Sequence, residues 1–197
     1  MDHTYQAVTS KLQTDYKQQL KVPLDSQVLL ITGGSSGASA INNAMKQIVI
    51  RLLDEHPKLY VFHQVGKGKL DDFGGIKNDR MHLLEFLSPM FAYMGAADVV
   101  VTRASGNTLA ELGVQGKPAI AIPSPVLADG HQLRNADYLQ KEQAALIVHE
   151  EALPEGLYTA ISQLLNHPEE GRALAQKLQH SSPSGAAKKL AKLLVEL

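Results

Sequence analysis

The chain has 197 residues, 44% of them hydrophobic, which is enough for an ordinary globular core. Lysine and arginine total 19 against 20 aspartates and glutamates, and tryptophan is absent, so the sequence offers neither a basic field nor stacking platforms for nucleic acid. The absence of cysteine excludes disulfides and thiolate metal sites, and no apolar run approaches the ~18 residues of a membrane span, so the chain is expected to be cytoplasmic.

The first predicted element is an amphipathic helix that ends before Pro23, because apolar residues recur there at helical spacing, at Tyr5, Val8, Leu12, Tyr16 and Leu20. Apolar runs bounded by turn residues predict strands at 27–32, 59–64, 81–86, 98–102, 118–122 and 145–148. A helix is predicted after each of these strands except the second, which is followed by an exposed loop at 65–79 rich in glycine and lysine. The helix after the third strand is capped by Ser88 and opened by Pro89, and the later helices are predicted at 129–140, 154–165, 168–179 and 185–197. This alternation predicts an α/β fold, a Rossmann-like parallel sheet of about six strands with helices on both faces.

The turn Gly33-Gly34-Ser35-Ser36-Gly37 follows the first strand and permits three interpretations. Glycines let the backbone approach a phosphate closely, while the next helix N-terminus stabilises its charge. The second interpretation is a tight turn without a ligand. The third is the nucleophile elbow of a small serine hydrolase, with Ser35 as nucleophile and Asp129 and His149 as its nearest partners. The turn matches neither a Walker loop nor the dinucleotide fingerprint, so nucleoside triphosphates and NAD are poorly supported.

Two later strand-to-helix turns, at 103–107 and 123–131, are also polar. In an open α/β sheet, ligands sit outside the carboxyl ends of the strands, where helix N-termini offer free N–H groups. Both turns are therefore expected to face one ligand with an anionic part. Glu111 lies one helical turn beyond Asn107 and Thr108, so its carboxylate either accepts from the ribose of that ligand or faces solvent. Gln132 and Asn135 carry amides that both donate and accept, which suits a sugar hydroxyl.

Six segments in this order resemble the donor-binding domain of the MurG family, bacterial glycosyltransferases that add N-acetylglucosamine to the lipid-linked peptidoglycan precursor. The segments are GGSSGAS, HQVGKG, LLEFLSPM, TRASGNTLAEL, GKPAIAIPSP and GHQLRNA, and the resemblance runs from about Val28 to the C-terminus. It implies the C-terminal half of a GT-B fold and UDP-N-acetylglucosamine as the ligand, with no cofactor. The eight histidines lack metal-binding spacing, so no metal site is expected.

The resemblance also implies roles for individual residues. Glu111 would bind the donor ribose, and the diphosphate and sugar would be held by Ser105, Gly106, Asn107 and Thr108, although the family often has its glycine one position earlier. The main chain of Phe86 and Leu87 would read the uracil edge, with Met90 packing nearby; without the resemblance, Phe86 is expected to be a core aromatic. The remaining residues assigned to the donor site are Gly34, Ser35, Ser36, Arg103, His131, Gln132 and Asn135. His63 and the glycines at 66 and 68 are given only a structural or loop role.

Residues 1–22 are interpreted as an amphipathic helix that follows an interdomain linker, and residues 23–197 as the UDP-sugar binding domain. In the MurG family the acceptor site and the general base lie in an N-terminal domain, so no catalytic residue is assigned and the chain alone is expected to be inactive. The partner would be an acceptor-binding domain, or a separate subunit as in the dolichol-pathway transferase, acting on the lipid-linked acceptor at the cytoplasmic face of the membrane. A non-catalytic UDP-sugar binding module is the alternative of a different class.

Overall fold

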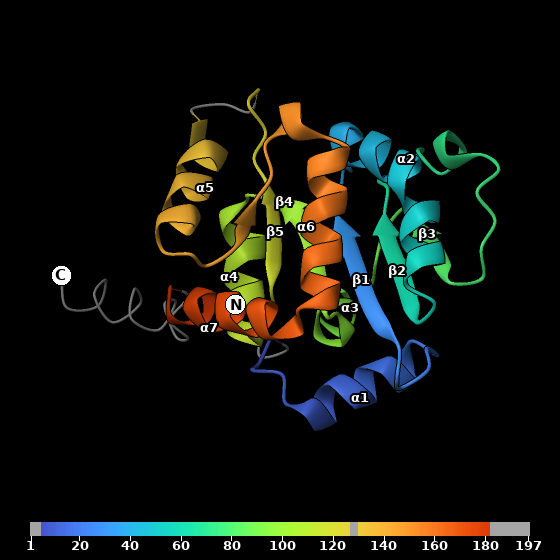
Figure 1. Ribbon diagram of the computed structural model, residues 1–197, viewed down its shortest axis with the longest axis horizontal. Helices are drawn as coiled ribbons and strands as arrows, with labels where there is room; N and C mark the ends of the chain where they lie inside the picture. The colour runs from blue at the N-terminus through green and yellow to red at the C-terminus, as the bar shows by residue number, and fades with distance from the viewer. Residues whose placement is uncertain (1–4, 127–129, 182–197) are drawn as a thin grey trace, which may run out of the picture.

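The computed structural model describes residues 5–126 and 130–181. Within these ranges, six parallel strands form one sheet in the order β3-β2-β1-β4-β5-β6 (Figure 1). The strands are β1 Gln27–Thr32, β2 Leu59–Gln64, β3 Met81–Leu84, β4 Val99–Arg103, β5 Ala119–Ile122 and β6 Leu146–Ile147. The predicted sheet is confirmed, and its order places β1 beside β4 at the point where the chain reverses its direction of progress across the sheet.

The two edge strands are shorter than predicted. β3 pairs only with β2, and because Gln64, the last residue of β2, lies opposite Leu84, the ladder stops there. Phe86 therefore lies beyond the strand and is 63% exposed, so the expectation that it is a core aromatic was wrong. β6 has only two residues because just Ile120 and Ala121 of β5 pair with it.

Seven helices and two short 3-10 turns surround the sheet within the described ranges. They are α1 Ser10–Gln19, α2 Ser39–Glu55, α3 Met90–Ala96, α4 Gly106–Gln115, α5 His131–Lys141, α6 Glu155–Asn166 and α7 Pro168–Ser181, with η1 Asp71–Phe73 and η3 Glu150–Ala152. The helix predicted at 185–197 lies outside the described residues. No helix in the part of the chain that the structure describes combines the length and apolarity needed to cross a membrane.

Two predicted helix starts were wrong. Tyr5 and Val8 precede α1, which begins at Ser10 because the Oγ1 atom of Thr9 accepts the N–H of Leu12 at 3.2 Å and caps it. Ser88 does not cap α3: Pro89 is extended, with ψ at 132°, so it takes the cap position itself and the helix starts one residue later.

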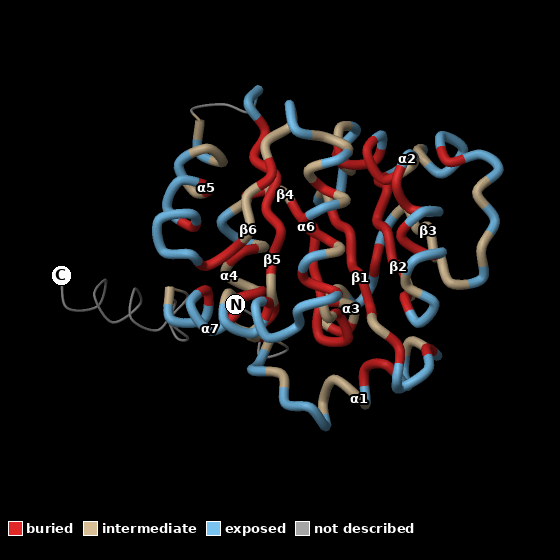
Figure 2. The backbone as a smooth tube through the Cα atoms, viewed as in Figure 1, coloured by how far each residue is buried: buried red, intermediate tan, exposed pale blue. Residues whose placement is uncertain are grey.

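The core has two layers because successive residues of a buried strand point to opposite faces of the sheet. Leu29 and Ile31 of β1 pack with α2 and α6, whereas Val28 and Leu30 pack with α3, α4 and α5. In Figure 2 the four central strands are buried almost throughout, the edge strands β3 and β6 are half-buried, and the helices are exposed along their outer sides. Strands covered on both faces read as continuous apolar runs, which explains why the sequence located them.

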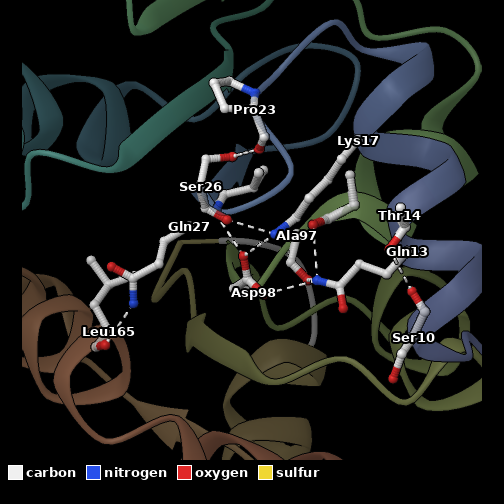
Figure 3. A network of polar contacts seen from close by, with 12 residues as sticks. Ser10, Gln13, Thr14, Lys17, Pro23, Ser26, Gln27, Ala97, Asp98 and Leu165 are labelled. Carbon is white, nitrogen blue, oxygen red and sulfur yellow. Dashed lines mark hydrogen bonds and ion pairs between the residues drawn. The ribbon is translucent and has the colours of Figure 1, made fainter.

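A buried polar cluster fixes α1 against the amino ends of β1 and β4 (Figure 3). Asp98 accepts hydrogen bonds from Gln13 Nε2 at 2.8 Å and from the N–H of Val28 at 2.8 Å, and its Oδ2 lies 3.2 Å from Lys17 Nζ. Lys17 also donates to the carbonyl of Ser26 at 2.6 Å, and only 9% of its side chain is exposed. One carboxylate therefore joins α1 to both central strands.

We expect Asp98→Ala to lower the free energy of unfolding by about 3 kcal/mol, because it removes the carboxylate that balances the charge of the buried Lys17 ammonium and leaves the Val28 N–H without that acceptor. Denaturant unfolding followed by circular dichroism measures this change. Asp25→Ala is the control: it breaks a 2.8 Å ion pair with Lys58 in which both side chains are about two-thirds exposed, and such pairs contribute little. Equal effects of the two substitutions would contradict the role given to the buried cluster.

Candidate functional site

A cavity of about 420 Å³ opens at the carboxyl edge of the sheet, between the ends of β1 and β4. Its lining comes from the end of β4, from three loops and from the helix starts that follow them: Gly33, Gly34, Ser35, Ser36, Gly37, Ala38, Ser39, Thr102, Arg103, Ser105, Thr108, Ser124 and Gln132. The glycine turn and the two polar turns, which are far apart in the sequence, thus share one cavity. This is the crevice in which open α/β sheets bind their ligands.

The electrostatics of the cavity favour an anion. The helices α2, α4 and α5 each contribute a residue near their start, and none of the three starts is capped by a side-chain hydrogen bond. None of these helices has an acidic residue in its first turn, whereas α6 and α7, which contribute nothing to the cavity, both do. Uncapped first-turn N–H groups and the positive end of the helix dipole therefore act on the cavity without a competing carboxylate.

The glycine turn needs its glycines. Gly34 and Gly37 have φ values of +82° and +68°, a region that side chains rarely adopt. At Gly37 a Cβ atom would also lie 2.0 Å from the carbonyl oxygen of Val65, so the loop after β2 packs directly on this turn. The close backbone approach is typical of an anion cradle, although a tight turn without a ligand would need it as well.

The structure does not assemble the hydrolase alternative. His149 follows β6, three strands away from β1, which corresponds to about 14 Å at the usual strand spacing. No hydrogen bond among the described residues joins Ser35 to His149, and Asp129 lies outside the described residues. A nucleophile needs its base within hydrogen-bond reach, so we do not retain this interpretation.

Arg103, the last residue of β4, places a cation at the cavity. Its guanidinium NH1 donates to Glu150 Oε1 at 2.5 Å and to the carbonyl of Ile122 at 3.3 Å, and 13% of its side chain is exposed. The ion pair fixes the guanidinium between β4, β5 and η3. Sequence patterns gave no sign of Glu150, because it comes from a segment far along the chain.

The turn between β4 and α4 is held from two sides. Ser105 Oγ donates to Thr108 Oγ1 at 2.9 Å, so this N-cap serine does not cap α4. Asn135 Nδ2 of α5 donates to the carbonyl of Ala104 at 2.9 Å. Gly106 and Asn107 begin the helix on its exposed side. The Asn135 amide therefore supports the turn between β4 and α4.

The start of α5 contributes Gln132 to the cavity. Gln132 Oε1 accepts the N–H of Ser124 at 2.9 Å, which ties the helix to the loop after β5 and leaves the amide nitrogen as the donating end. His131 is exposed, and its Nδ1 lies 2.9 Å from Arg134 NH2, one turn further along the same helix. Of the three predicted residues on this helix, Gln132 is the one that lines the cavity.

Glu111, Leu87, Phe86 and Met90 lie outside the cavity lining. Glu111 is half-buried on α4, one turn beyond Thr108; burial raises the pKa of its carboxyl group, while a hydrogen bond from Tyr5 acts in the opposite direction. Leu87 is 1% exposed, and Met90 packs at the margin of the core cluster under α3 and α4. These residues can meet a ligand only if it extends beyond the cavity.

The structure thus brings together seven predicted residues: Gly34, Ser35, Ser36, Arg103, Ser105, Thr108 and Gln132. Sequence analysis did not assign Thr102, at the end of an apolar strand run, or Ser124, two residues beyond another, although the carboxyl end of a strand was the available signal. It also gave no ligand role to Gln64, whose contacts depend on how distant loops meet.

The family model and the curated relatives that match this chain point to the same family of glycosyltransferases. The model of the glycosyltransferase family 28 C-terminal domain matches residues 28–194. Over 188 residues the chain is 32% identical to the UDP-N-acetylglucosamine–N-acetylmuramyl-(pentapeptide) pyrophosphoryl-undecaprenol N-acetylglucosamine transferase of Crocosphaera subtropica, covering 95% of this chain and 53% of that protein. The enzyme of the same name from Geotalea daltonii is 39% identical over 145 residues, which cover 72% of this chain and 40% of the relative. The chain spans about half the length of the curated relatives it matches.

Solved structures agree with the fold. MurG of Acinetobacter baumannii superposes with a TM-score of 0.75 and 27% identity, covering 96% of this chain and 56% of that one. A UDP-GlcNAc 2-epimerase from Neisseria meningitidis, bound to UDP-GlcNAc, gives a TM-score of 0.64 at 15% identity, covering 95% of this chain and 49% of that one, a likeness of fold alone. The predicted C-terminal GT-B domain fold is confirmed.

Thr108→Asp should weaken the binding of inorganic pyrophosphate by at least about tenfold, because it places a carboxylate on the first turn of α4, at the cavity. Titration followed by amide chemical shifts of the cavity loops measures the affinity. Thr108→Asn is the matched control, because asparagine has nearly the same shape as aspartate and no charge, and it should weaken binding less than threefold. If the two variants are equally impaired, shape and not charge decides binding at this helix start.

Proposed function

Because this chain belongs to the glycosyltransferase family 28 C-terminal domain family, we propose that it is the donor-binding part of an inverting glycosyltransferase that uses UDP-N-acetylglucosamine to glycosylate a lipid-linked peptidoglycan precursor. The observation that carries this proposal is the convergence of three uncapped helix N-termini on one cavity at the β1–β4 junction. A diphosphate is the part of the donor that this arrangement suits.

The diphosphate is assigned to the glycine turn and to Ser105–Thr108. Main-chain N–H groups at these two helix starts bind anionic oxygens without bringing counter-charges of their own, and Gly34 leaves open space where a side chain would stand. Arg103 adds one cation, already oriented by Glu150. A donor held here has its leaving group stabilised as negative charge develops on the departing diphosphate.

The uridine is assigned to the surface beyond Thr108, towards α3. Glu111 lies one turn along α4, where its carboxylate can accept hydrogen bonds from both ribose hydroxyls. The main chain at Phe86 and Leu87 precedes α3 and can read a uracil edge through its remaining polar groups, since the Leu87 N–H is bonded to Gln64, and Met90 lies beside it. The sugar is assigned to Gln132, on the opposite side of the phosphate turns, with His131 and Asn135 on the same helix.

The acceptor is assigned to a partner of this domain. The curated relatives are named for transfer to an undecaprenol-linked acceptor, and the chain spans about half of their length. We place the acceptor site and the general base on an acceptor-binding half, either in the same polypeptide or in a separate subunit. The lipid-linked acceptor would bring the complete enzyme to the cytoplasmic face of the membrane as a peripheral protein.

Glu111→Ala should weaken UDP binding by roughly tenfold to a hundredfold, because a charge-assisted pair of hydrogen bonds to the ribose is lost. Calorimetry measures the change, and Glu142→Ala, which removes an exposed carboxylate at the end of α5, is the control expected to bind normally. Burial raises the pKa of Glu111, so its carboxylate is protonated at a higher pH than that of an ordinary glutamate. As the pH is lowered, the UDP affinity of wild type should therefore begin to fall earlier, and Glu111→Ala should lack this part of the pH dependence. Equal UDP affinity in wild type and Glu111→Ala would disprove the ribose assignment.

Gln132→Ala should erase the preference for UDP-N-acetylglucosamine over UDP-N-acetylgalactosamine, because the amide nitrogen that faces the cavity is the group assigned to the sugar hydroxyls. Plain UDP should bind the variant within about threefold of wild type, since Glu111 and the phosphate turns remain. Competition of the three ligands against both proteins provides the measurement. A uniform loss for all three would mean that Gln132 supports the loop at Ser124 and does not read the sugar.

A further inference from the structure

The side chain of Gln64 joins two loops of the candidate site. Gln64 is the last residue of β2 and is 1% exposed. Its Nε2 donates to the carbonyl of Gly34 at 2.7 Å, and its Oε1 accepts the N–H of Leu87 at 3.2 Å. One buried amide is therefore bonded to the glycine turn after β1 and to the segment that links β3 to α3.

Both bonds are made to main-chain groups that define the proposed site. Gly34 lies in the turn assigned to the diphosphate, and its φ of +82° shows that this turn has a specific, unusual shape. Leu87 lies in the segment assigned to the uracil. A side chain that holds the two together fixes the spacing between the phosphate end and the base end of a nucleotide.

Three neighbouring contacts make the loops after β1, β2 and β3 one connected unit. Gly37 and Gly66 are packed back to back, since a Cβ on Gly66 would lie 2.5 Å from the carbonyl oxygen of Ser36. Lys69 Nζ donates to that same Ser36 carbonyl at 2.9 Å. The N–H of Gly68 donates to Glu85 Oε1 at 2.5 Å, which connects the second loop to the third.

The strand end that carries Gln64 is itself fixed. His63 Nε2 lies 3.0 Å from Asn42 Oδ1, and Asn42 Nδ2 donates to the carbonyl of Val65 at 2.9 Å. His63 is fully buried, and burial lowers the pKa of its ring to about 3, so the ring is neutral at physiological pH. A neutral, packed strand end gives Gln64 a rigid base from which to hold the loops.

We propose that Gln64 is a positioning residue that couples the base end of the donor site to its phosphate end, so that either ligand group bound alone aligns the loop for the other. The proposal rests on the proposed function, because it concerns the same nucleotide. It predicts that UDP binds more tightly than its two parts would suggest, and that this surplus depends on the amide of Gln64.

The test compares UDP, uridine and inorganic pyrophosphate on wild type and Gln64→Met by calorimetry or competition. Methionine retains the volume of glutamine and loses both hydrogen bonds. We expect UDP to bind the variant at least tenfold more weakly, while uridine and pyrophosphate each change less than threefold, because each contacts one loop whose own shape remains. An unchanged UDP affinity, or a parallel loss for all three ligands, would overturn the proposal.

Gln115→Met is the matched control. Gln115 is also a 1% exposed glutamine, and its Nε2 donates to the carbonyl of Phe91 at 2.9 Å, but it lies at the far end of α4 from the cavity. It should lose stability in denaturant unfolding and retain all three affinities within twofold. If Gln115→Met also loses affinity for UDP while keeping its affinity for uridine and pyrophosphate, a loosened fold and not the loop connection explains the effect.

Hydrogen exchange separates this inference from the proposed function. In wild type, pyrophosphate should slow the exchange of the Leu87 amide, which donates to Gln64, and in Gln64→Met this protection should disappear. If wild type fails to bind UDP, the proposed function falls, and the exchange experiment still decides whether Gln64 connects the loops. Pyrophosphate that leaves Leu87 exchange unchanged in wild type would refute the coupling.

Discussion

The parallel pairing of β1 with β4 is the constraint on which the rest of the structure depends. Leu29 to Thr32 lie beside Val99 to Thr102, so the chain must cross to the opposite half of the sheet between these strands. Helices that follow the two strands then leave the sheet edge in different directions and open a crevice between their N-termini. The polar groups of the cavity reach it from this junction, from the loop after β5 or from the start of α5.

The polar groups at the amino ends of the central strands are paired within the protein, whereas main-chain donors at the carboxyl ends are left for a ligand. At the amino ends, Asp98 accepts from Gln13, Lys17 and the N–H of Val28, so a buried cation and a free main-chain donor are both satisfied within the protein. At the carboxyl ends the helix N-termini are left without side-chain caps. The unsatisfied donors are therefore concentrated on one edge of the sheet, where a ligand can pair with them.

Neutral amides shape this edge. Gln64 holds Gly34 and Leu87, Asn135 holds Ala104, and Gln132 holds Ser124, so the main chain of each loop is bonded to an amide that comes from another element. An amide can donate and accept without adding charge, so it orders the loops and leaves the positive potential of the helix starts intact. A carboxylate in any of these places would compete with the anion for the same donors.

The sequence by itself determined the sheet and most of the loops that form the site. Strands buried on both faces must be continuous apolar runs, and turns with positive φ need glycine, so β1, β2, β4, β5 and the turn at Gly34 were readable from local pattern. The tertiary structure decided the ends of the edge strands, the cap of α3, the exposure of Phe86 and the partners of Arg103, Asn135 and Gln64. These features depend on which distant segments meet: a ladder stops where its neighbour ends, and a side-chain amide or guanidinium takes whichever carbonyl or carboxylate the fold brings within 3 Å or so.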